Sequence, residues 1–157
     1  MLPGRPVSGV IIAGLKAIIS NISLMPSAAM KFPVILCVDD ELGILHSIKR
    51  CLAFEHYEVL TASGGIQALE ILESRLGAVD LMIVDYRMPQ MTGDEFLSHV
   101  RARYGRIRAI MISGYLDLAR ISGELNDGGI CRILEKPWDN KELLEAIRTA
   151  LPAGEPA

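Results

Sequence analysis

Residues 34–40 read VILCVDD, five apolar residues followed at once by two aspartates. Four more short runs rich in apolar and β-branched residues follow, at 57–60, 81–84, 107–112 and 130–134. The runs are continuously apolar rather than alternating, which is typical of parallel strands covered on both faces. The sequence therefore predicts a sheet of buried parallel strands.

The segments between these runs carry apolar residues at helical spacing. The positions are Leu45/Ile48/Leu52, Leu69/Leu72/Leu76, Phe96/Leu97/Val100 and Leu144/Ile147/Leu151, and a weaker helical pattern lies around 116–125. Asp139, with Glu142 three residues later, predicts the start of the last helix. Five strands alternating with five helices predict an α/β fold, a doubly wound five-stranded parallel sheet with helices on both faces.

The composition bounds the class of protein. The 157 residues, half of them apolar and 22% charged, suit one globular domain. A net charge of −3 argues against a sequence-independent nucleic-acid binder, which needs a clustered basic surface. The three cysteines form no C-x-x-C pair, so we expect reduced thiols, with Cys37 and Cys131 packed in the core of central strands.

The first 29 residues differ from the rest, because they hold two of the 16 basic side chains and none of the 19 acidic ones. They read as an extra segment, disordered or a loose helix, before a folded domain at 30–152 and a short tail at 153–157. A docked amphipathic helix is an alternative. A signal peptide is another, although Lys16 interrupts its apolar stretch.

Polar residues follow the strands where an α/β sheet binds its ligands, at the carboxyl ends. They are Asp39 and Asp40 after the first strand, Asp85 after the third, Ser113 after the fourth and Lys136 after the fifth. If the first and third strands are neighbours, three carboxylates converge, and each close pair repels by roughly 4 kcal/mol at an effective dielectric of about 20. Such a set of oxygen ligands favours Mg²⁺.

The same group of residues can handle a phosphoryl group. A divalent ion, the Lys136 ammonium and the Ser113 hydroxyl can stabilise its three oxygens. Asp85 stands alone on its strand end, so it is the best-placed acceptor, since aspartate can act as a nucleophile that forms an aspartyl phosphate.

Four stretches together resemble a known family. They are VILCVDDE (34–41), IVDYRMPQMTG (83–93), IMISGY (110–115) and LEKPW (134–138). The set resembles the receiver, or phosphoacceptor, domain of two-component response regulators, over about residues 32–151. The resemblance implies a flavodoxin-like strand order 2-1-3-4-5.

The resemblance also assigns roles by position. It implies that Asp85 accepts the phosphoryl group, that Ser113 supplies the switch hydroxyl and that Lys136 pairs with the phosphoryl group. It implies a Mg²⁺ site made by Asp39 (largely through water), Asp40 (directly), Asp85 and the backbone carbonyl of Arg87. A cis peptide bond before Pro137 is expected as well. Ile133 departs from the family pattern, which has Tyr or Phe at this position.

The resemblance implies a stand-alone response regulator, a phosphoacceptor switch rather than an enzyme. Asp85 would receive its phosphoryl group from a histidine kinase or a phosphotransfer protein. The signal would pass to an unknown downstream protein, with no nucleic-acid or membrane partner, from a monomer or weak dimer. Phosphoryl transfer from an ATP-using kinase implies a cytoplasmic location.

Three other function classes were weighed against this reading. A phosphatase resembling the haloacid dehalogenase family needs a second aspartate two residues after the nucleophile, where this chain has Arg87. A flavin-binding module needs a Ser/Thr/Gly-rich loop after the first strand, where Asp39, Asp40 and Glu41 would repel a phosphate. A scaffold that keeps the fold without the chemistry would not need the complete set of charged residues.

Overall fold

The computed structural model describes residues 31–75, 77–114, 121 and 129–151. From Phe32 onward the chain forms a compact unit of its own. Its strands are β1 (Val34–Val38), β2 (Glu58–Ala62), β3 (Leu81–Asp85), β4 (Arg108–Ser113) and β5 (Ile130–Glu135). The helices in the described part are α2 (Leu42–Leu52), α3 (Gly65–Ser74), α4 (Gly93–Tyr104) and α6 (Asn140–Ala150). The helix expected around 116–125 and the expectations for 1–29 and 153–157 fall outside these ranges, Ile121 excepted.

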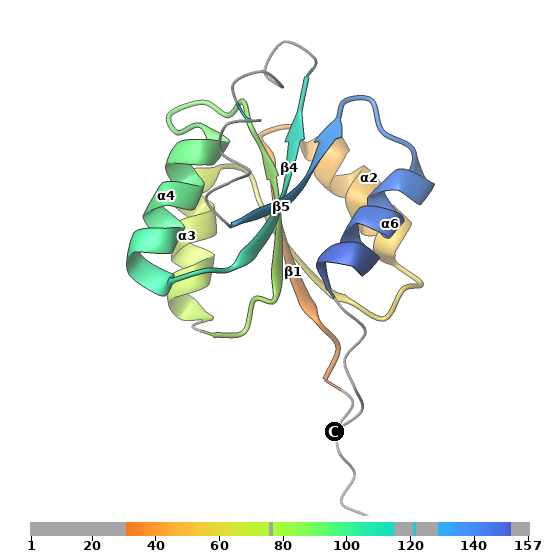
Figure 1. The fold of residues 1–157 in the computed structure, drawn as a ribbon, viewed down its shortest axis with the longest axis horizontal. Coiled ribbons are helices and arrows are strands. Elements are labelled where there is room, and N and C mark those ends of the chain that lie inside the picture. The colour runs from red at the N-terminus through yellow and green to blue at the C-terminus, as the bar shows by residue number, and fades with distance from the viewer. Residues whose placement is uncertain (1–30, 76, 115–120, 122–128, 152–157) are drawn as a thin grey trace, which may run out of the picture. The chain divides into compact units, whose positions relative to one another are not determined.

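The five strands form one parallel sheet in the order β2-β1-β3-β4-β5, which confirms the predicted doubly wound fold. Helices α3 and α4 cover one face of the sheet, and α2 and α6 cover the other (Figure 1). Because all strands are parallel, their carboxyl ends lie along one edge, where β1 and β3 are neighbours.

Each central strand divides its side chains between two cores. On β1, Leu36 and Val38 belong to the core on the α3–α4 face, whereas Ile35 and Cys37 belong to the core on the α2–α6 face. Successive side chains of a strand point to opposite faces, so a strand covered on both sides must be apolar throughout. Burying each such aliphatic side chain contributes about 1.5–3 kcal/mol, and this explains the unbroken apolar run at 34–38.

The buried face of the last helix differs from the predicted one. α6 buries Leu143, Ala146, Ile147 and Ala150, a complete i, i+3, i+4, i+7 pattern, while Leu144 and Leu151 are only partly buried. Two of these buried residues are alanines, whose small side chains allow a close contact with the sheet. A search for regularly spaced large apolar residues does not detect alanine, so the face was predicted incorrectly. The predicted start is confirmed, since the Asp139 carboxylate accepts from the Glu142 N–H at 2.9 Å.

The expectation of two buried cysteines is right for one residue and wrong for the other. Cys37 is fully buried on β1, whereas Cys131 is exposed on β5. β5 is an edge strand, and the pairing with β4 skips Cys131, since Ala109 pairs with Ile130 and Ile110 with Arg132. The register of the two strands shifts at this point, so Cys131 lies outside the pairing, and its thiol is exposed rather than packed in the core.

None of the helices in the described ranges is long and apolar enough to cross a membrane.

Candidate functional site

Three aspartates meet at the carboxyl edge of the sheet, as the sequence predicts. Asp39 directly follows β1, and Asp85 is the last residue of β3, the neighbouring strand. Carboxylate oxygens of Asp39, Asp40 and Asp85 all lie within 4.8 Å of one another. Asp39 and Asp85 are buried, while Asp40 is exposed to solvent. Two carboxyl groups are therefore buried within 4.8 Å of each other.

Lys136 brings a positive charge into this cluster. Its Nζ lies 2.9 Å from Asp85 Oδ1 and 3.2 Å from Asp39 Oδ2. The backbone N–H of Lys136 donates to the carbonyl of Ser113 at 2.8 Å, which anchors the residue beside β4. The peptide bond to Pro137 is cis, as expected. The side chain from the end of β5 thus reaches across β4 to the two central strands.

Burial dominates the electrostatics of the two buried carboxyl groups. It raises the pKa of Asp85 to about 6; Lys136 opposes this shift, and the charges of Asp39 and Asp40 add to it. Burial likewise raises the pKa of Asp39, against the opposing N–H of Glu41 and the charge of Lys136. Burial alone would lower the pKa of Lys136, but its hydrogen bond to Asp85 and the charge of Asp39 raise it.

The donor set fits a magnesium ion. Three carboxylates face a single ammonium within this cluster, so a net negative charge remains to be neutralised. Oxygen ligands in such a cluster suit a hard divalent cation such as Mg²⁺. Arg87, whose carbonyl is the fourth expected ligand, lies two residues beyond the end of β3 with its side chain exposed.

Ser113 lies next to the acidic cluster on the same edge. It is the buried last residue of β4, and β3 places Asp85 opposite Ile112, one residue before it. The Ser113 hydroxyl donates to the carbonyl of Gly114 at 3.1 Å. The structure therefore brings all four polar strand ends to one edge, with the hydroxyl engaged by its own loop.

Ile133 occupies the position where the family pattern has an aromatic ring. It lies on β5 opposite Met111 and packs, partly buried, against the core on the α3–α4 face. A β-branched side chain is restricted at χ1 and has no ring to rotate. Tyr115, which follows Ser113 by two residues, lies outside the described part of the chain.

Two further residues of this region make contacts that the sequence analysis did not predict. Glu41 extends the acidic run, and its Oε1 lies 3.7 Å from Lys136 Nζ. Gly93 starts α4 against the back of the acceptor, where an added Cβ would stand 2.5 Å from the Asp85 carbonyl oxygen. A glycine at the start of a helix could have indicated a close contact there. The approach to Asp85 depends on how α4 packs against β3, which the neighbouring residues alone do not predict.

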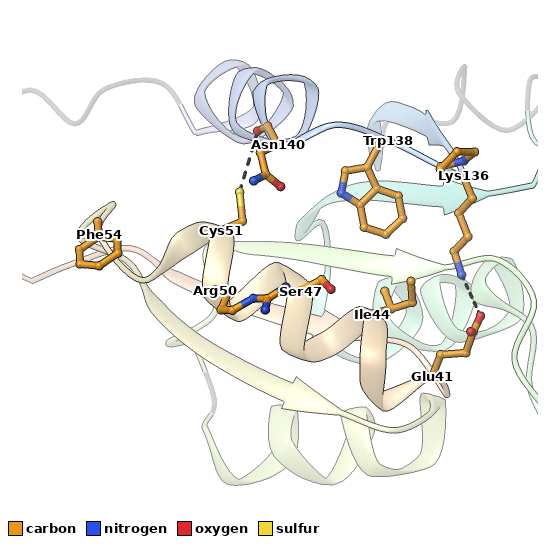
Figure 2. Close-up of a pocket in the computed structure, with 10 residues that line it drawn as sticks. Glu41, Ile44, Ser47, Arg50, Cys51, Phe54, Lys136, Trp138 and Asn140 are labelled. Atoms are coloured by element: carbon orange, nitrogen blue, oxygen red, sulfur yellow. Dashed lines mark hydrogen bonds and ion pairs between the residues drawn. The ribbon is translucent and has the colours of Figure 1, made fainter.

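A groove of about 930 Å³ adjoins the site between α2 and the segment that joins β5 to α6 (Figure 2). Glu41 and Lys136 form its end next to the acidic cluster, Ile44 and Trp138 lie between, and Phe54 marks its far end. Across the groove, the Cys51 thiol lies 3.9 Å from the Asn140 carbonyl, the distance of a sulfur hydrogen bond that links α2 to α6.

The fold and the site together define an α/β module with a doubly wound parallel sheet, whose carboxyl edge carries an acidic cluster and a lysine. The profile of the response regulator receiver domain matches residues 35–148. The chain belongs to this family, and with it to the proteins of two-component phosphorelay signalling.

Relatives with known names agree with the family. The hydrogenase transcriptional regulatory protein HoxA of Cupriavidus necator is 37% identical over 123 residues, which cover 78% of this chain and 25% of that protein. Sporulation initiation phosphotransferase F of Bacillus subtilis is 33% identical over 120 residues, which cover 75% of this chain and 93% of that protein. The chain thus spans about a quarter of the length of HoxA.

Solved structures agree with the fold. A response regulator receiver domain protein from Clostridium thermocellum superposes with a TM-score of 0.70 at 31% identity, covering 75% of this chain and 93% of the other. The response regulator TrrA of Thermotoga maritima, solved with Mg²⁺ and BeF, gives a TM-score of 0.65 at 30% identity and covers 76% and 99%. Receiver domains bind Mg²⁺ at an acidic pocket, and this chain has an aspartate cluster of that kind.

Proposed function

We propose that the chain is a single-domain response regulator that accepts a phosphoryl group on Asp85. The observation that carries the proposal is the surroundings of this carboxylate. It ends β3 beside two further aspartates, with the Lys136 ammonium 2.9 Å away. A buried carboxyl whose pKa is raised to about 6 is typical of a functional position.

In the proposed reaction a carboxylate oxygen of Asp85 attacks the phosphorus atom of a phosphohistidine. The bond between this oxygen and phosphorus forms, and the bond from phosphorus to the imidazole nitrogen breaks. The nitrogen keeps the electron pair and takes up a proton, so the donor leaves as neutral histidine. The products are an aspartyl phosphate and an unmodified donor.

Lys136 and Ser113 have complementary roles in this proposal. The Lys136 ammonium, already in contact with Asp85, donates to an oxygen of the bound phosphoryl group. The Ser113 hydroxyl leaves the Gly114 carbonyl and donates to a second oxygen. This exchange of partner would distinguish the phosphorylated from the unphosphorylated form at the end of β4.

Mg²⁺ would be held by Asp40 directly, by Asp39 largely through water, by Asp85 and by the Arg87 carbonyl. Support comes from the oxygens of the three aspartates, which lie within 4.8 Å of one another. The chemistry that Mg²⁺ supplies when bound is neutralisation of charge on the carboxylates and on the phosphoryl oxygens.

The proposed donor is a histidine kinase or a phosphotransfer protein, and the signal passes to a downstream protein by direct contact. The chain would act as a switch rather than an enzyme, as a monomer or weak dimer in the cytoplasm, with no nucleic-acid or membrane partner. The coverage of 93% of sporulation initiation phosphotransferase F supports a receiver that works without a second domain.

The test is incubation with acetyl phosphate, with and without Mg²⁺, followed by intact mass measurement. We expect the wild-type chain to gain one phosphoryl group only when Mg²⁺ is present, and Asp85→Asn to gain none. The conservative change keeps the shape of the side chain and removes the nucleophile. Absence of any Mg²⁺-dependent gain in the wild type would reject the proposed function.

A further inference from the structure

Glu41 is the exposed member of the ion-pair cluster around Lys136. Its side chain is 66% exposed, against 2% for Asp39 and 5% for Asp85. Glu41 and Lys136 point toward each other at the end of the groove (Figure 2), with Oε1 and Nζ 3.7 Å apart. The Glu41 N–H donates to Asp39 Oδ1 at 2.8 Å, so the site itself fixes the backbone from which this carboxylate projects.

The charge of Glu41 acts on a phosphodonor in two ways. A donor carries negative charge and must reach the buried Asp85 from solvent, and the exposed Glu41 carboxylate lies beside the Lys136 ammonium that contacts Asp85. Like charges at short range repel, although salt screens the effect at an exposed position. Glu41 also lies 3.7 Å from the Lys136 ammonium, which itself lies 2.9 Å from Asp85, so the two carboxylates share one positive charge. Both features make the potential beside Lys136 less favourable for a small anion.

We propose that Glu41 is a specificity-determining residue that disfavours small, highly charged phosphodonors and reserves Asp85 for a protein donor. A protein can present a basic side chain to Glu41, which turns the repulsion into an attraction. A small free anion cannot. The inference rests on the proposed function, because it concerns the donor of the same phosphoryl group.

The experiment compares the rates at which acetyl phosphate and the less charged phosphoramidate phosphorylate the full chain in saturating Mg²⁺. The variants are Glu41→Gln and Glu41→Lys, with Glu70→Gln on α3 as the matched control for net charge. With acetyl phosphate at low salt we expect Glu41→Gln to react about threefold to tenfold faster than wild type. Glu41→Lys should be faster still, and Glu70→Gln should match wild type.

Donor charge and salt separate this role from a purely structural one. We expect a smaller gain with phosphoramidate, and a gain that shrinks as ionic strength rises. Equal rates for wild type and Glu41→Gln, a slower variant, or the same gain with both donors at every salt concentration would overturn the inference. None of those outcomes contradicts the proposed function. The proposed function is rejected only if the wild-type chain takes up no phosphoryl group from either donor.

Discussion

The carboxyl group of Asp85 combines deep burial with two neighbouring carboxylates, so its ionisation costs free energy in the metal-free protein. Its pKa is about 6, against 3.8 for an unperturbed aspartate. Between these values the folded state binds a proton that the unfolded state does not, so stability falls as pH rises through this window. The full cost is roughly 3 kcal/mol.

Asp85→Asn should therefore be more stable than wild type without metal at about pH 7.5, by up to roughly 3 kcal/mol in the free energy of unfolding. The difference should shrink toward zero at about pH 4, where the wild-type carboxyl is protonated in the folded state. Urea unfolding in EDTA at both pH values measures it. A constant difference would mean that ionisation of Asp85 is not its cause.

Asp40 is the exposed carboxylate of the cluster and the proposed direct ligand of Mg²⁺. Asp40→Ala should weaken Mg²⁺ binding by about tenfold or more, since even an outer-shell change commonly costs that much. The single tryptophan, Trp138, lines the groove beside Lys136, so its fluorescence can follow a Mg²⁺ titration. Unchanged affinity would contradict the ligand assignment.

At the residue level, sequence analysis identified the groups proposed to do the chemistry but not how they contact one another. Asp39, Asp85 and Lys136 were predictable because each follows a recognisable strand. The raised pKa of Asp85 and the ion pair between Glu41 and Lys136 were not, because both depend on distances across strands. The exposed Cys131 was missed for a similar reason, since a bulge is a property of strand pairing.

The start of α4 packs directly against the end of β3, and Gly93 makes this contact fit. A Cβ at position 93 would stand 2.5 Å from the Asp85 carbonyl oxygen and 3.0 Å from the Tyr86 Cα. Gly93→Ala should therefore shift the loop between β3 and α4. We expect a loss of about 1–3 kcal/mol in the free energy of unfolding and slower phosphorylation by acetyl phosphate.

Gly43→Ala is the matched control, because an added Cβ there meets nothing within 4 Å. Gly43 lies in α2, where alanine is favoured over glycine by about 0.5–1 kcal/mol, so this variant should be slightly more stable than wild type. Urea unfolding of both variants checks the pair. Equal stability of Gly93→Ala and wild type would show that the contact relaxes without cost.

At the scale of elements, the predicted strands agree with the observed ones to within a residue or two at each end. The strands were predicted well because burial on both faces requires a continuous run of apolar residues. The face of α6 was predicted less well, because Ala146 and Ala150 make contacts that a search for large apolar residues passes over. Caps are local, and the Asp139 cap was accordingly predictable.

For the whole molecule, every proposed site residue lies between Asp39 and Lys136, after the composition break at Met30. A variant that lacks residues 1–29 should therefore take up one phosphoryl group from acetyl phosphate at the wild-type rate. Intact mass and thermal melting of the shortened chain check this. A shortened chain that is insoluble or melts much lower would favour a docked N-terminal helix instead.

The order of the strands was predicted by family resemblance rather than by periodicity. Alternating strands and helices indicate a parallel doubly wound sheet, but several orders satisfy that alternation. Convergence of the aspartates requires that β1 and β3 be neighbours, and the structure has them side by side. Several strand orders meet that requirement, so the full order came from the family resemblance alone.

The ion pair of Lys136 with Asp39 joins residues 97 positions apart. Such a pairing is non-local, so it forms only when the chain between the two residues has been ordered at a cost in loop entropy. A local opening that detaches edge strand β5 would remove Lys136 from the site, while Asp39 and Asp85 stay in place on central strands. Amide hydrogen exchange on β5 would detect such an opening. Phosphorylation of Asp85 would therefore report whether β5 is docked on the sheet. Mutations that loosen β5 should reduce the rate of phosphorylation before they lower the melting temperature.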